Sequence, residues 1–275
     1  MPNEKSPALP SHARIVIVGG GAIGCSIAYH LGKLAIRDVV LLEKRTITAG
    51  STWHAAGLLG QMRSKVNLTR LMQYSAKLCA TIGAETGQDV GWRQTGSLRL
   101  AGSDARLEEL KRAVTAARSY GFDMELIGPG EARDRFPLLD IAGVRGATWI
   151  ATDGHVDPYA LTMAYAKGAR AGGVRIVEGV TVTGFGRAGR RIATVETDRG
   201  VIACETVVNA AGLWARHVGE MAGLELPITA VEHQYLVTEK SPKVPDRLPS
   251  LRDPDNNFYL KPEPGALAIG GWEDN

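Results

Sequence analysis

The chain has few of the residues that mark several common protein classes. Only three cysteines occur among its 275 residues, Cys25, Cys79 and Cys204, and their wide spacing contains no CxxC pair. This pattern predicts buried free thiols and no metal site, and it argues against a disulfide framework. No apolar run approaches the ~20 residues that a transmembrane helix needs, so we expect no membrane span.

An excess of one charge is also missing. The 32 Lys and Arg residues nearly balance the 29 Asp and Glu residues, which leaves a net charge of +3 without a basic block and gives no reason to expect a nucleic-acid partner. The first residues, 1–13, lack the apolar stretch of a secretory signal. We therefore expect a flexible lead-in and a cytoplasmic protein. The composition is ordinary for a globular chain of one large domain or two closely joined domains.

Glycine, by contrast, is abundant, with 33 residues, and its most informative cluster follows a short apolar run. Ile15–Val18 reads as a buried strand, the glycine-rich turn follows it, and Cys25–Lys33 reads as a helix. Asp38–Leu42 is the next apolar run and ends at Glu43. Strand, turn, helix and strand within about 30 residues predict one βαβ unit.

The turn itself fits the dinucleotide fingerprint G-x-G-x-x-G. Gly19 permits the tight turn, Gly21 lets the backbone approach a pyrophosphate, and Gly24 lets the helix pack closely on the strand. The free N–H groups at the helix start carry a partial positive charge that favours phosphate, and Ala22 and Ile23 of the turn are further candidate cofactor contacts. This context predicts a dinucleotide site.

An acidic residue stands where the fingerprint requires one. Glu43, followed by Lys44, ends the second strand 19 residues after Gly24, and a carboxylate there can bind ribose hydroxyls. The spacing alone does not separate NAD from FAD. The structural alternative is a glycine-rich turn followed by a glutamate that happens to lie at this distance.

Further elements alternate between helix and strand, which indicates an α/β chain. The apolar periodicity predicts helices at Asn67–Thr86, Asp104–Tyr120, Pro158–Ala171 and Leu213–Ala222. Short apolar runs predict strands at Ser97–Ala101, Val174–Val177, Thr181–Phe185, Arg191–Thr197, Val201–Ala203, Val207–Ala210, His233–Thr238, Asn257–Lys261 and Ala266–Gly270. Thr46–Gly60 has no clean period and is expected to form an ordered loop.

The segment Ala49–Gly57, with the sequence AGSTWHAAG, resembles the flavin-attachment loop of the dimethylglycine and sarcosine dehydrogenases in the D-amino-acid-oxidase-like superfamily. The resemblance implies FAD as the cofactor and a covalent bond from His54 to the flavin 8α-methyl group. It also implies cofactor contacts from the rest of the loop, namely Gly50, Ser51, Thr52, Ala55, Ala56 and Gly57. The alternative for His54 is a structural loop histidine.

Other matches to this family extend over roughly Arg14 to Glu273. Val180 lies where the superfamily holds adenine, and Ala211, Gly212 and Trp214 lie in a segment that resembles the second flavin-contacting strand and turn. Three further segments resemble family motifs: Asp153–Pro158, Glu232–Tyr235 and Phe258–Leu260. The last two resemble strands on the substrate side.

The resemblance implies a Rossmann-like FAD-binding domain interleaved with a mixed-sheet substrate domain. We expect FAD-binding parts at about 14–85 and 150–225, and substrate-domain parts at about 86–149 and 226–275, which together form one incomplete oxidoreductase domain over 14–275. The family has a later segment that returns to the flavin, so the chain is expected to be C-terminally truncated. Family members also occur in the mitochondrial matrix, which is the alternative location.

The implied reaction is oxidative demethylation of an N-methyl amino acid such as dimethylglycine or sarcosine, in which hydride transfer to the flavin gives an iminium and then formaldehyde. His233 is the candidate for tuning the protonation of the amine, and Tyr259 is the candidate for a hydrogen-bonding partner. A substrate carboxylate usually binds Arg, but the sequence does not single out Arg252 among the arginines. The electron acceptor is not identified. The alternatives are a truncated, non-catalytic flavin-binding fragment, another amino-acid flavin oxidoreductase, or a NAD-dependent dehydrogenase.

Overall fold

The computed structural model describes residues 8–272, and the chain folds into two compact units. Unit 1 comprises 1–55, 81–90 and 158–231, and unit 2 comprises 56–80, 91–157 and 232–275. Each unit is therefore discontinuous in sequence. The assignment of FAD binding and substrate binding to such parts stays a prediction. Residues 1–7 of the expected lead-in lie outside the described residues.

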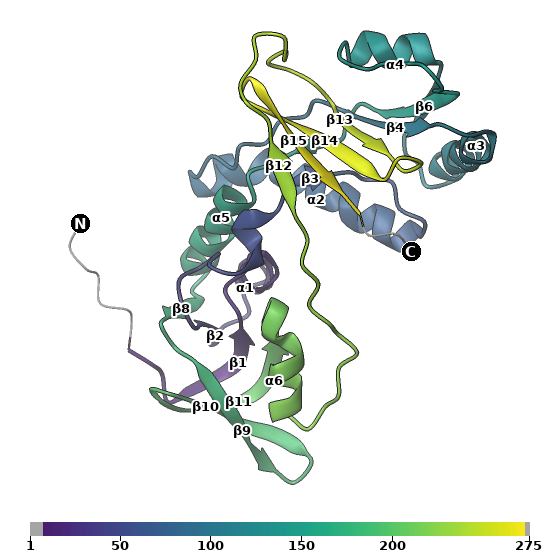
Figure 1. Cartoon of the computed structure of the whole chain (residues 1–275). Helices are drawn as coiled ribbons and strands as arrows, with labels where there is room; N and C mark the ends of the chain where they lie inside the picture. The colour runs from purple at the N-terminus through teal and green to yellow at the C-terminus, as the bar shows by residue number, and fades with distance from the viewer. Residues whose placement is uncertain (1–7, 273–275) are drawn as a thin grey trace. The chain divides into compact units, whose positions relative to one another are not determined.

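A six-stranded sheet of order β8-β2-β1-β11-β10-β9 forms the centre of unit 1 (Figure 1). Its four parallel strands are β8 (Arg175–Glu178), β2 (Val39–Glu43), β1 (His12–Val18) and β11 (Gly200–Asn209), and β10 (Arg191–Thr197) and β9 (Val182–Ala188) continue it antiparallel. Because Val16–Val18 of β1 and Val39–Leu42 of β2 are buried, these apolar runs belong to a sheet covered on both faces.

Helices α1 (Ala22–Lys33) and α5 (Pro158–Ala171) pack against each other in unit 1 at glycine contacts. A Cβ built on Gly32 would lie 3.2 Å from the Cα of Gly172, and one on Gly168 would lie 2.6 Å from the Tyr29 ring. Small residues at these positions let the two helices approach closely. The other unit 1 elements are η1 (Ser51–His54), η2 (Gly212–Trp214), α6 (Ala215–Met221) and the C-terminal end of α2 (Val66–Thr86).

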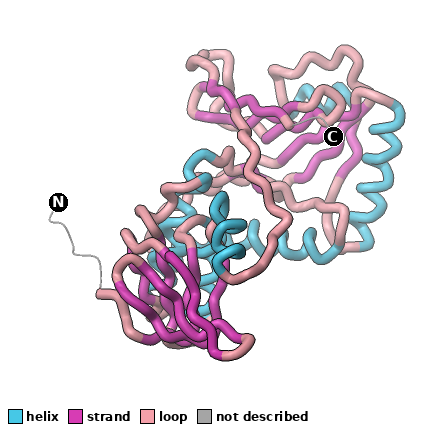
Figure 2. Tube along the Cα trace, turned by 60° about the horizontal axis from the view of Figure 1, so that its bottom comes forward, coloured by secondary structure: helices cyan, strands magenta, loops and turns pink. Residues whose placement is uncertain are grey.

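Unit 2 is built on a seven-stranded mixed sheet of order β12-β15-β14-β13-β4-β6-β5. The strands are β12 (Tyr235–Val237), β15 (Ala266–Gly271), β14 (Phe258–Glu263), β13 (Ser250–Asp253), β4 (Ser97–Ala101), β6 (Gly146–Ile150) and β5 (Glu125–Ile127). Figure 2 shows these strands in magenta, with the helices of the unit in cyan. The helices of unit 2 are α3 (Asp104–Ser119), α4 (Pro129–Arg135) and the first part of α2. Strands β3 (Leu58–Leu59) and β7 (Gly154–His155) form a separate pair.

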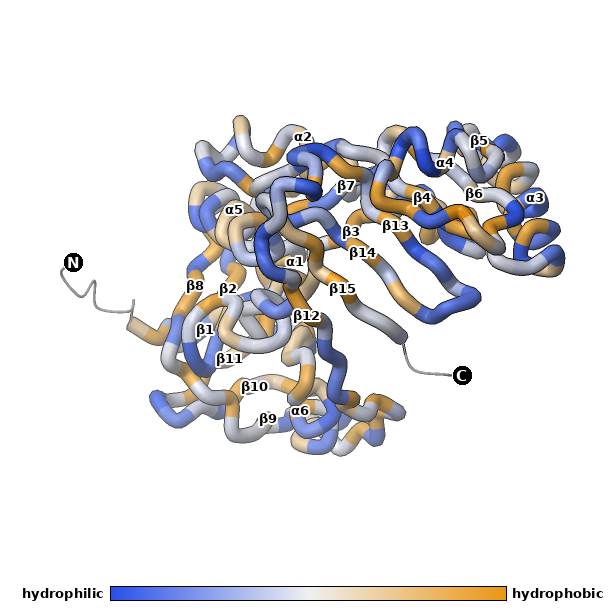
Figure 3. The backbone as a smooth tube through the Cα atoms, turned by 45° about the horizontal axis from the view of Figure 1, so that its top comes forward, coloured by the Kyte–Doolittle hydropathy of each residue, from blue (hydrophilic) through white to orange (hydrophobic). Residues whose placement is uncertain are grey.

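The strands of the unit 2 sheet alternate between an apolar face and a polar face. Leu98, Leu100, Leu251 and Phe136 form a buried cluster, and Leu260 packs against it. The residues between them in the sequence point to the other face, because side chains alternate along a strand. α3 follows the amphipathic pattern predicted for it, and Figure 3 draws hydrophilic and hydrophobic positions in turn along it.

The structure confirms a mixed α/β chain and corrects several predicted boundaries. α1 begins at Ala22 and not at Cys25, because the extended Gly21 caps it. The two strands predicted at Val201–Ala203 and Val207–Ala210 are one continuous strand, β11, which pairs with β1 and β10. The single helix predicted over 213–222 is divided into η2 and α6.

A few elements were absent from the prediction. They are the short strands β3, β5, β6, β7 and β13 and the polar helix α4. The cysteines follow the prediction, since all three are buried and free. No helix within residues 8–272 combines the length and apolar character that crossing a bilayer requires.

Candidate functional site

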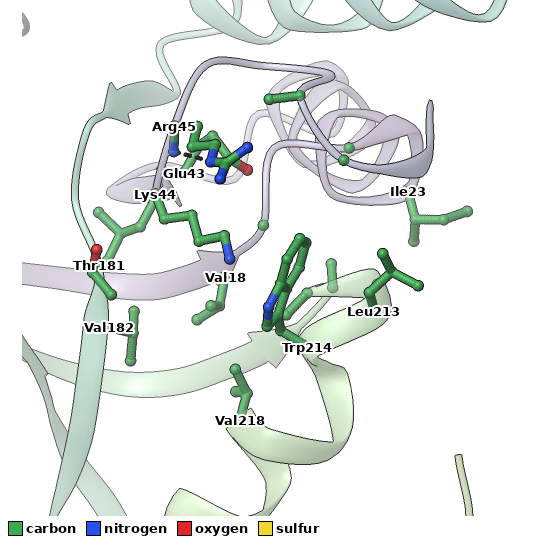
Figure 4. A pocket seen from close by; sticks show the side chains of 18 of the residues that line it. Val18, Ile23, Glu43, Lys44, Arg45, Thr181, Val182, Leu213, Trp214 and Val218 are labelled. Atoms are coloured by element: carbon green, nitrogen blue, oxygen red, sulfur yellow. Dashed lines mark hydrogen bonds between the residues drawn. The ribbon is translucent and has the colours of Figure 1, made fainter. Parts of the chain in front are cut away.

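A cavity of about 420 Å³ opens in unit 1 where β1, β2 and β11 end. Figure 4 shows it with Glu43, Lys44 and Arg45 on one side, and with Val18, Val182 and Val218 along an apolar wall. Most of the predicted cofactor residues line this cavity. They are Gly19, Gly21, Ala22, Ile23, Glu43, Lys44, Gly50, Ser51, Thr52, Val180, Ala211, Gly212 and Trp214.

Two glycines of the fingerprint are required by backbone packing. Gly19 has φ of +112°, which favours glycine, and a Cβ there would lie 2.4 Å from the Ala210 carbonyl oxygen. A Cβ on Gly24 would lie 1.9 Å from the carbonyl oxygen of Gly19. Gly24 does not line the cavity, but its missing side chain lets the first turn of α1 lie against the turn that forms the cavity.

Gly21, the second glycine of the fingerprint, leaves space at the helix start. A Cβ built on it would meet only the Thr52 hydroxyl, at 3.1 Å. That hydroxyl accepts a hydrogen bond of 3.0 Å from the Ala22 N–H, so the loop 49–52 is fixed against the first turn of α1. The start of a 12-residue helix, with an open glycine before it, is suited to a phosphate group.

The Glu43 carboxylate is held in position by the backbone. Its Oε2 accepts from the Gly20 N–H at 2.7 Å and its Oε1 accepts from the Arg45 N–H at 2.8 Å. Each carboxylate oxygen has a second lone pair, so the group keeps capacity to accept from ribose hydroxyls. The Glu43 carbonyl oxygen accepts from the Val180 N–H at 3.0 Å, which places Val180 beside the end of β2.

Lys44 and Trp214 meet in the cavity. The Lys44 Nζ lies 3.2 Å from the centroid of the Trp214 ring, a cation–π contact visible in Figure 4. Burial lowers the pKa of Lys44 below its usual value. Gly50 faces the same ring, since a Cβ on it would lie 3.8 Å from Trp214. An aromatic ring, a cation and a helix start around one cavity fit the aromatic and phosphate parts of a dinucleotide.

The remaining residues of the predicted flavin loop lie outside this cavity. His54 ends η1, is exposed, and its ring centroid lies 3.7 Å from that of Trp53. Ala55 follows it as the last residue of that segment of unit 1, and Ala56 and Gly57 belong to unit 2. The Gly57 carbonyl oxygen accepts from the N–H of Val156, within the Asp153–Pro158 motif, at 3.0 Å. A flavin bond at His54 stays a prediction.

The two catalytic candidates are in unit 2. Tyr259 lies on β14, is 6% exposed, and its ring centroid is 5.6 Å from that of Trp272. Burial raises the pKa of Tyr259. His233 is exposed and precedes β12 by two residues. Their catalytic roles stay predictions.

A model of the FAD dependent oxidoreductase family, DAO, matches residues 14–275. The chain belongs to this family. The fingerprint turn, the glutamate held at the end of β2 and the cavity above them fit FAD, the cofactor of the family, in place of the NAD alternative. The fold class predicted from the resemblance is confirmed. Covalent attachment of the flavin to the chain stays a prediction.

Two curated relatives and one solved structure place the chain within the DAO family. It is 42% identical over 98% of its length to mitochondrial dimethylglycine dehydrogenase of Rattus norvegicus, and 39% identical over 98% to mitochondrial sarcosine dehydrogenase of Homo sapiens. The structure of L-proline dehydrogenase from P. horikoshii matches with a TM-score of 0.88 and 32% identity, over 96% of this chain and 71% of that chain. The chain spans about a third of the curated relatives, 32% and 30% of their lengths.

Sequence reasoning missed one group of side chains in unit 2. Asp153, Arg63 and Arg252 converge beside Gly60, although 192 positions separate Gly60 from Arg252. No local pattern connects residues so far apart. The one available signal was the Asp153–Pro158 motif, whose aspartate is buried and lies directly before β7.

Proposed function

We propose that this DAO-family chain forms the amine-oxidising part of an enzyme that demethylates an N-methyl amino acid such as dimethylglycine or sarcosine. The observation that carries the proposal is the identity of about 40% with dehydrogenases named for these two substrates, together with a complete fingerprint, Glu43 and cavity in unit 1. The proposal covers both the activity of a protein that contains this chain and the class of amine that the protein oxidises.

Bound FAD would supply a two-electron acceptor for the hydride of the carbon beside the amine nitrogen. The residues of the chain itself have to bind the amine and set its protonation state. The amine must be neutral when the hydride leaves, so a hydrogen-bond acceptor near the nitrogen favours the reaction. His233 and Tyr259 are our candidates for this environment. Hydrolysis of the resulting iminium by water releases formaldehyde and the demethylated amine.

The test is a single-turnover experiment on the protein loaded with FAD. Dimethylglycine or sarcosine, added without oxygen, is expected to bleach the flavin absorbance and to yield one formaldehyde per flavin. Tyr259→Phe, which keeps the ring that packs on Trp272, is expected to slow bleaching without changing FAD content. Bound FAD that neither substrate reduces would contradict the proposal and would favour the non-catalytic alternative.

Covalent attachment at His54 is a separate part of the proposal. Its support is the exposed position of His54 at the end of η1, three residues beyond Ser51, which lines the cavity. Acid-denatured and washed protein is expected to keep its yellow colour, and His54→Ala is expected to lose it. Colour that leaves both proteins would remove the covalent bond and would leave the redox proposal intact.

A second candidate is oxidation of a cyclic secondary amino acid, favoured by the structural match to L-proline dehydrogenase. Proline has no N-methyl group, so its oxidation releases no formaldehyde. Flavin bleaching by proline without formaldehyde would support this candidate. The names of the curated relatives also favour a mitochondrial location over the cytoplasm, and locating the tagged protein in cells would test this.

A further inference from the structure

Unit 2 contains a second cavity, of about 570 Å³, on the apolar face of its sheet. Leu100 of β4, Leu251 of β13 and Leu260 of β14 line it from the sheet. Leu251 and Leu260 are direct cross-strand partners, so their side chains project to the same face. Every residue that lines this cavity belongs to unit 2, and none of them lines the cavity of unit 1.

The segment that follows α4 forms a second wall of the cavity. Phe136, Leu138 and Val144 line the cavity from this segment. The Phe136 N–H donates to the Ala132 carbonyl oxygen at 2.9 Å, and the Leu139 N–H donates to the Phe136 carbonyl oxygen at 2.9 Å. The backbone therefore holds this wall in place, and the wall presents aromatic and aliphatic side chains to the cavity.

The cavity is open where this second wall turns. Gly143 lines it with a φ of +79°, and a Cβ built there would meet no atom within 4 Å. Leu138, in the same wall, is 40% exposed. Cavities that hold small molecules have volumes of about 300–1,000 Å³ and mostly apolar walls. The size and the lining therefore fit a small molecule with an apolar body.

The charged side chains that line this cavity are all acidic. Asp140, Asp253 and Asp255 line it, and among the residues that the structure describes no Lys, Arg or His does. Asp255 has a cationic partner, since Arg106 Nε lies 3.3 Å from its Oδ1. Within residues 8–272, neither Asp140 nor Asp253 forms an ion pair. The cavity therefore carries an excess of negative charge.

The two unpaired carboxylates differ in what they can still accept. Asp253 is 6% exposed and accepts hydrogen bonds from the Asp255 and Asn256 N–H groups at 3.1 Å each, and from the Asn256 side-chain amide at 2.8 Å. Asp140 is exposed, and its Oδ1 accepts from the Ala142 N–H at 3.0 Å. These donors are neutral, so both carboxylates keep their charge. The Asp140 Oδ2, which accepts no hydrogen bond from the described part of the chain, can accept from a charged donor.

The position of the cavity on β14 separates it from the catalytic candidate Tyr259. Phe258 lines the cavity together with Leu260. Side chains alternate along a strand, so Phe258 and Leu260 project to one face of the sheet and Tyr259 projects to the other. A molecule in this cavity would therefore lie across the sheet from Tyr259, and it would not be the amine that the proposed function oxidises.

We propose that the cavity of unit 2 binds a small organic cation, with an ammonium group on an aromatic or branched aliphatic body. The body packs between the leucines of the sheet and Phe136, and the ammonium group donates to Asp140. A cation is favoured because the carboxylates of the lining attract it and would repel an anion. The inference is independent of the proposed function, since it uses no residue of the unit 1 cavity and neither catalytic candidate.

The test uses two probes with nearly the same apolar body and opposite charge. 4-Phenylbutylamine carries an ammonium group and 4-phenylbutyrate carries a carboxylate, and calorimetry measures the dissociation constant of each for the FAD-loaded protein. The amine is expected to bind with a dissociation constant of about 1 mM or lower, as is usual for a ligand of about 11 non-hydrogen atoms. 4-Phenylbutyrate is expected to bind at least about 10-fold more weakly, because like charges repel.

Variants test the charge and the space separately. Asp140→Asn is expected to weaken binding of the amine by about fivefold, the upper range for an exposed ion pair. Asp134→Asn is the matched control, because it changes an exposed carboxylate of α4 that does not line the cavity, and it should bind as wild type does. Val144→Phe fills the cavity and is expected to abolish binding.

A second apolar variant keeps the test decisive if Val144→Phe does not fold. Leu138→Ser shortens the wall at an exposed position, and it is expected to weaken binding of the amine by about fivefold through the lost apolar contact. Thermal unfolding of each variant shows whether the protein is folded. Wild-type affinity in both Asp140→Asn and Leu138→Ser would show that the amine binds elsewhere and would overturn the proposal.

Hydrogen exchange followed by mass spectrometry locates the bound amine. Peptides from 136–144 are expected to exchange more slowly when 4-phenylbutylamine is bound, and peptides from 12–43 are expected to stay unchanged. The proposal is wrong if the amine does not bind, if 4-phenylbutyrate binds equally well, or if 136–144 gains no protection. Protection of 136–144 by the peptide acetyl-Leu-Lys-Leu-amide, without binding of the amine, would assign the cavity to a protein partner and would also overturn the proposal.

Discussion

Single atoms decide the geometry of the fingerprint turn. At Gly24, a methyl group would lie 1.9 Å from a backbone carbonyl oxygen, which cannot move without opening the β1–α1 turn. Cys25, the next residue, shows the same tightness, because its Sγ lies 3.5 Å from the Gly20 carbonyl oxygen and burial raises the pKa of its thiol to about 12. The thiol therefore stays protonated, and Cys25 serves as a small packing residue.

Gly24→Ala is expected to destabilise the chain by about 3 kcal/mol, at the upper end for an overpacked buried position, and to reduce FAD binding. The added Cβ must push α1 away from the turn that lines the cavity. Urea unfolding and FAD titration measure the two effects. Gly130→Ala is the matched control, because a Cβ there meets no atom within 4 Å and Gly130 lies in α4. Equal stabilities of the two variants would contradict the packing argument.

His155 gives the stability a predictable pH dependence. Burial, with Lys261 and Arg93 adding to it and Glu263 opposing it, lowers the pKa of His155 from 6.5 to about 4. Between these values the unfolded chain binds a proton that the folded chain does not. The free energy of unfolding therefore falls as the pH decreases from about 6.5 to 4.

His155→Asn is expected to remove part of this loss, by up to about 1 kcal/mol, because the partly exposed ring is screened by solvent. Urea unfolding at pH 7 and at pH 4.5 measures the difference. His217→Gln, which changes a side chain that is 66% exposed, is expected to keep the wild-type pH dependence. An identical fall in stability for His155→Asn and wild type would show that another group causes it.

Whole elements follow local signals where those signals are complete. The βαβ unit and α5 were predicted because apolar periodicity, glycine and proline all lie within short windows. β13 was missed, because its four residues SLRD become a strand only through pairing with β4, about 150 positions earlier. Separation along the sequence also explains which parts of the candidate site could be predicted. The contact of Gly20 with Glu43 joins residues 23 positions apart, whereas the Arg252 cluster depends on tertiary pairing.

The N-cap of α3 tests a local signal directly. The Ser103 hydroxyl accepts a hydrogen bond of 3.2 Å from the Arg106 N–H and so caps the helix. Ser103→Ala is expected to destabilise unit 2 by about 1 kcal/mol. Thr115→Ala, at an exposed position of the same helix, is expected to be neutral or slightly stabilising. Thermal unfolding of both variants checks the difference, and equal midpoints would contradict it.

We expect the two units, each built from separate stretches of the chain, to have different tasks. Unit 1 holds the cavity, and unit 2 holds the catalytic candidates Tyr259 and His233. A ligand limited to the diphosphate half of FAD should therefore act on unit 1. This separates the two halves of the proposed enzyme in one experiment.

ADP, which contains the adenosine and diphosphate groups of FAD, is expected to stabilise unit 1 by about 2.7 kcal/mol at 100 times its dissociation constant. Hydrogen exchange followed by mass spectrometry should show slower exchange in peptides from 12–43 and 175–209, with little change in peptides from 97–150 and 250–271. Glu43→Ala loses the acceptor for the Gly20 N–H and should lose most of the effect. Equal protection of both sets of peptides would mean that ADP binding also involves unit 2, and the assignment of the dinucleotide site to unit 1 alone would then be wrong.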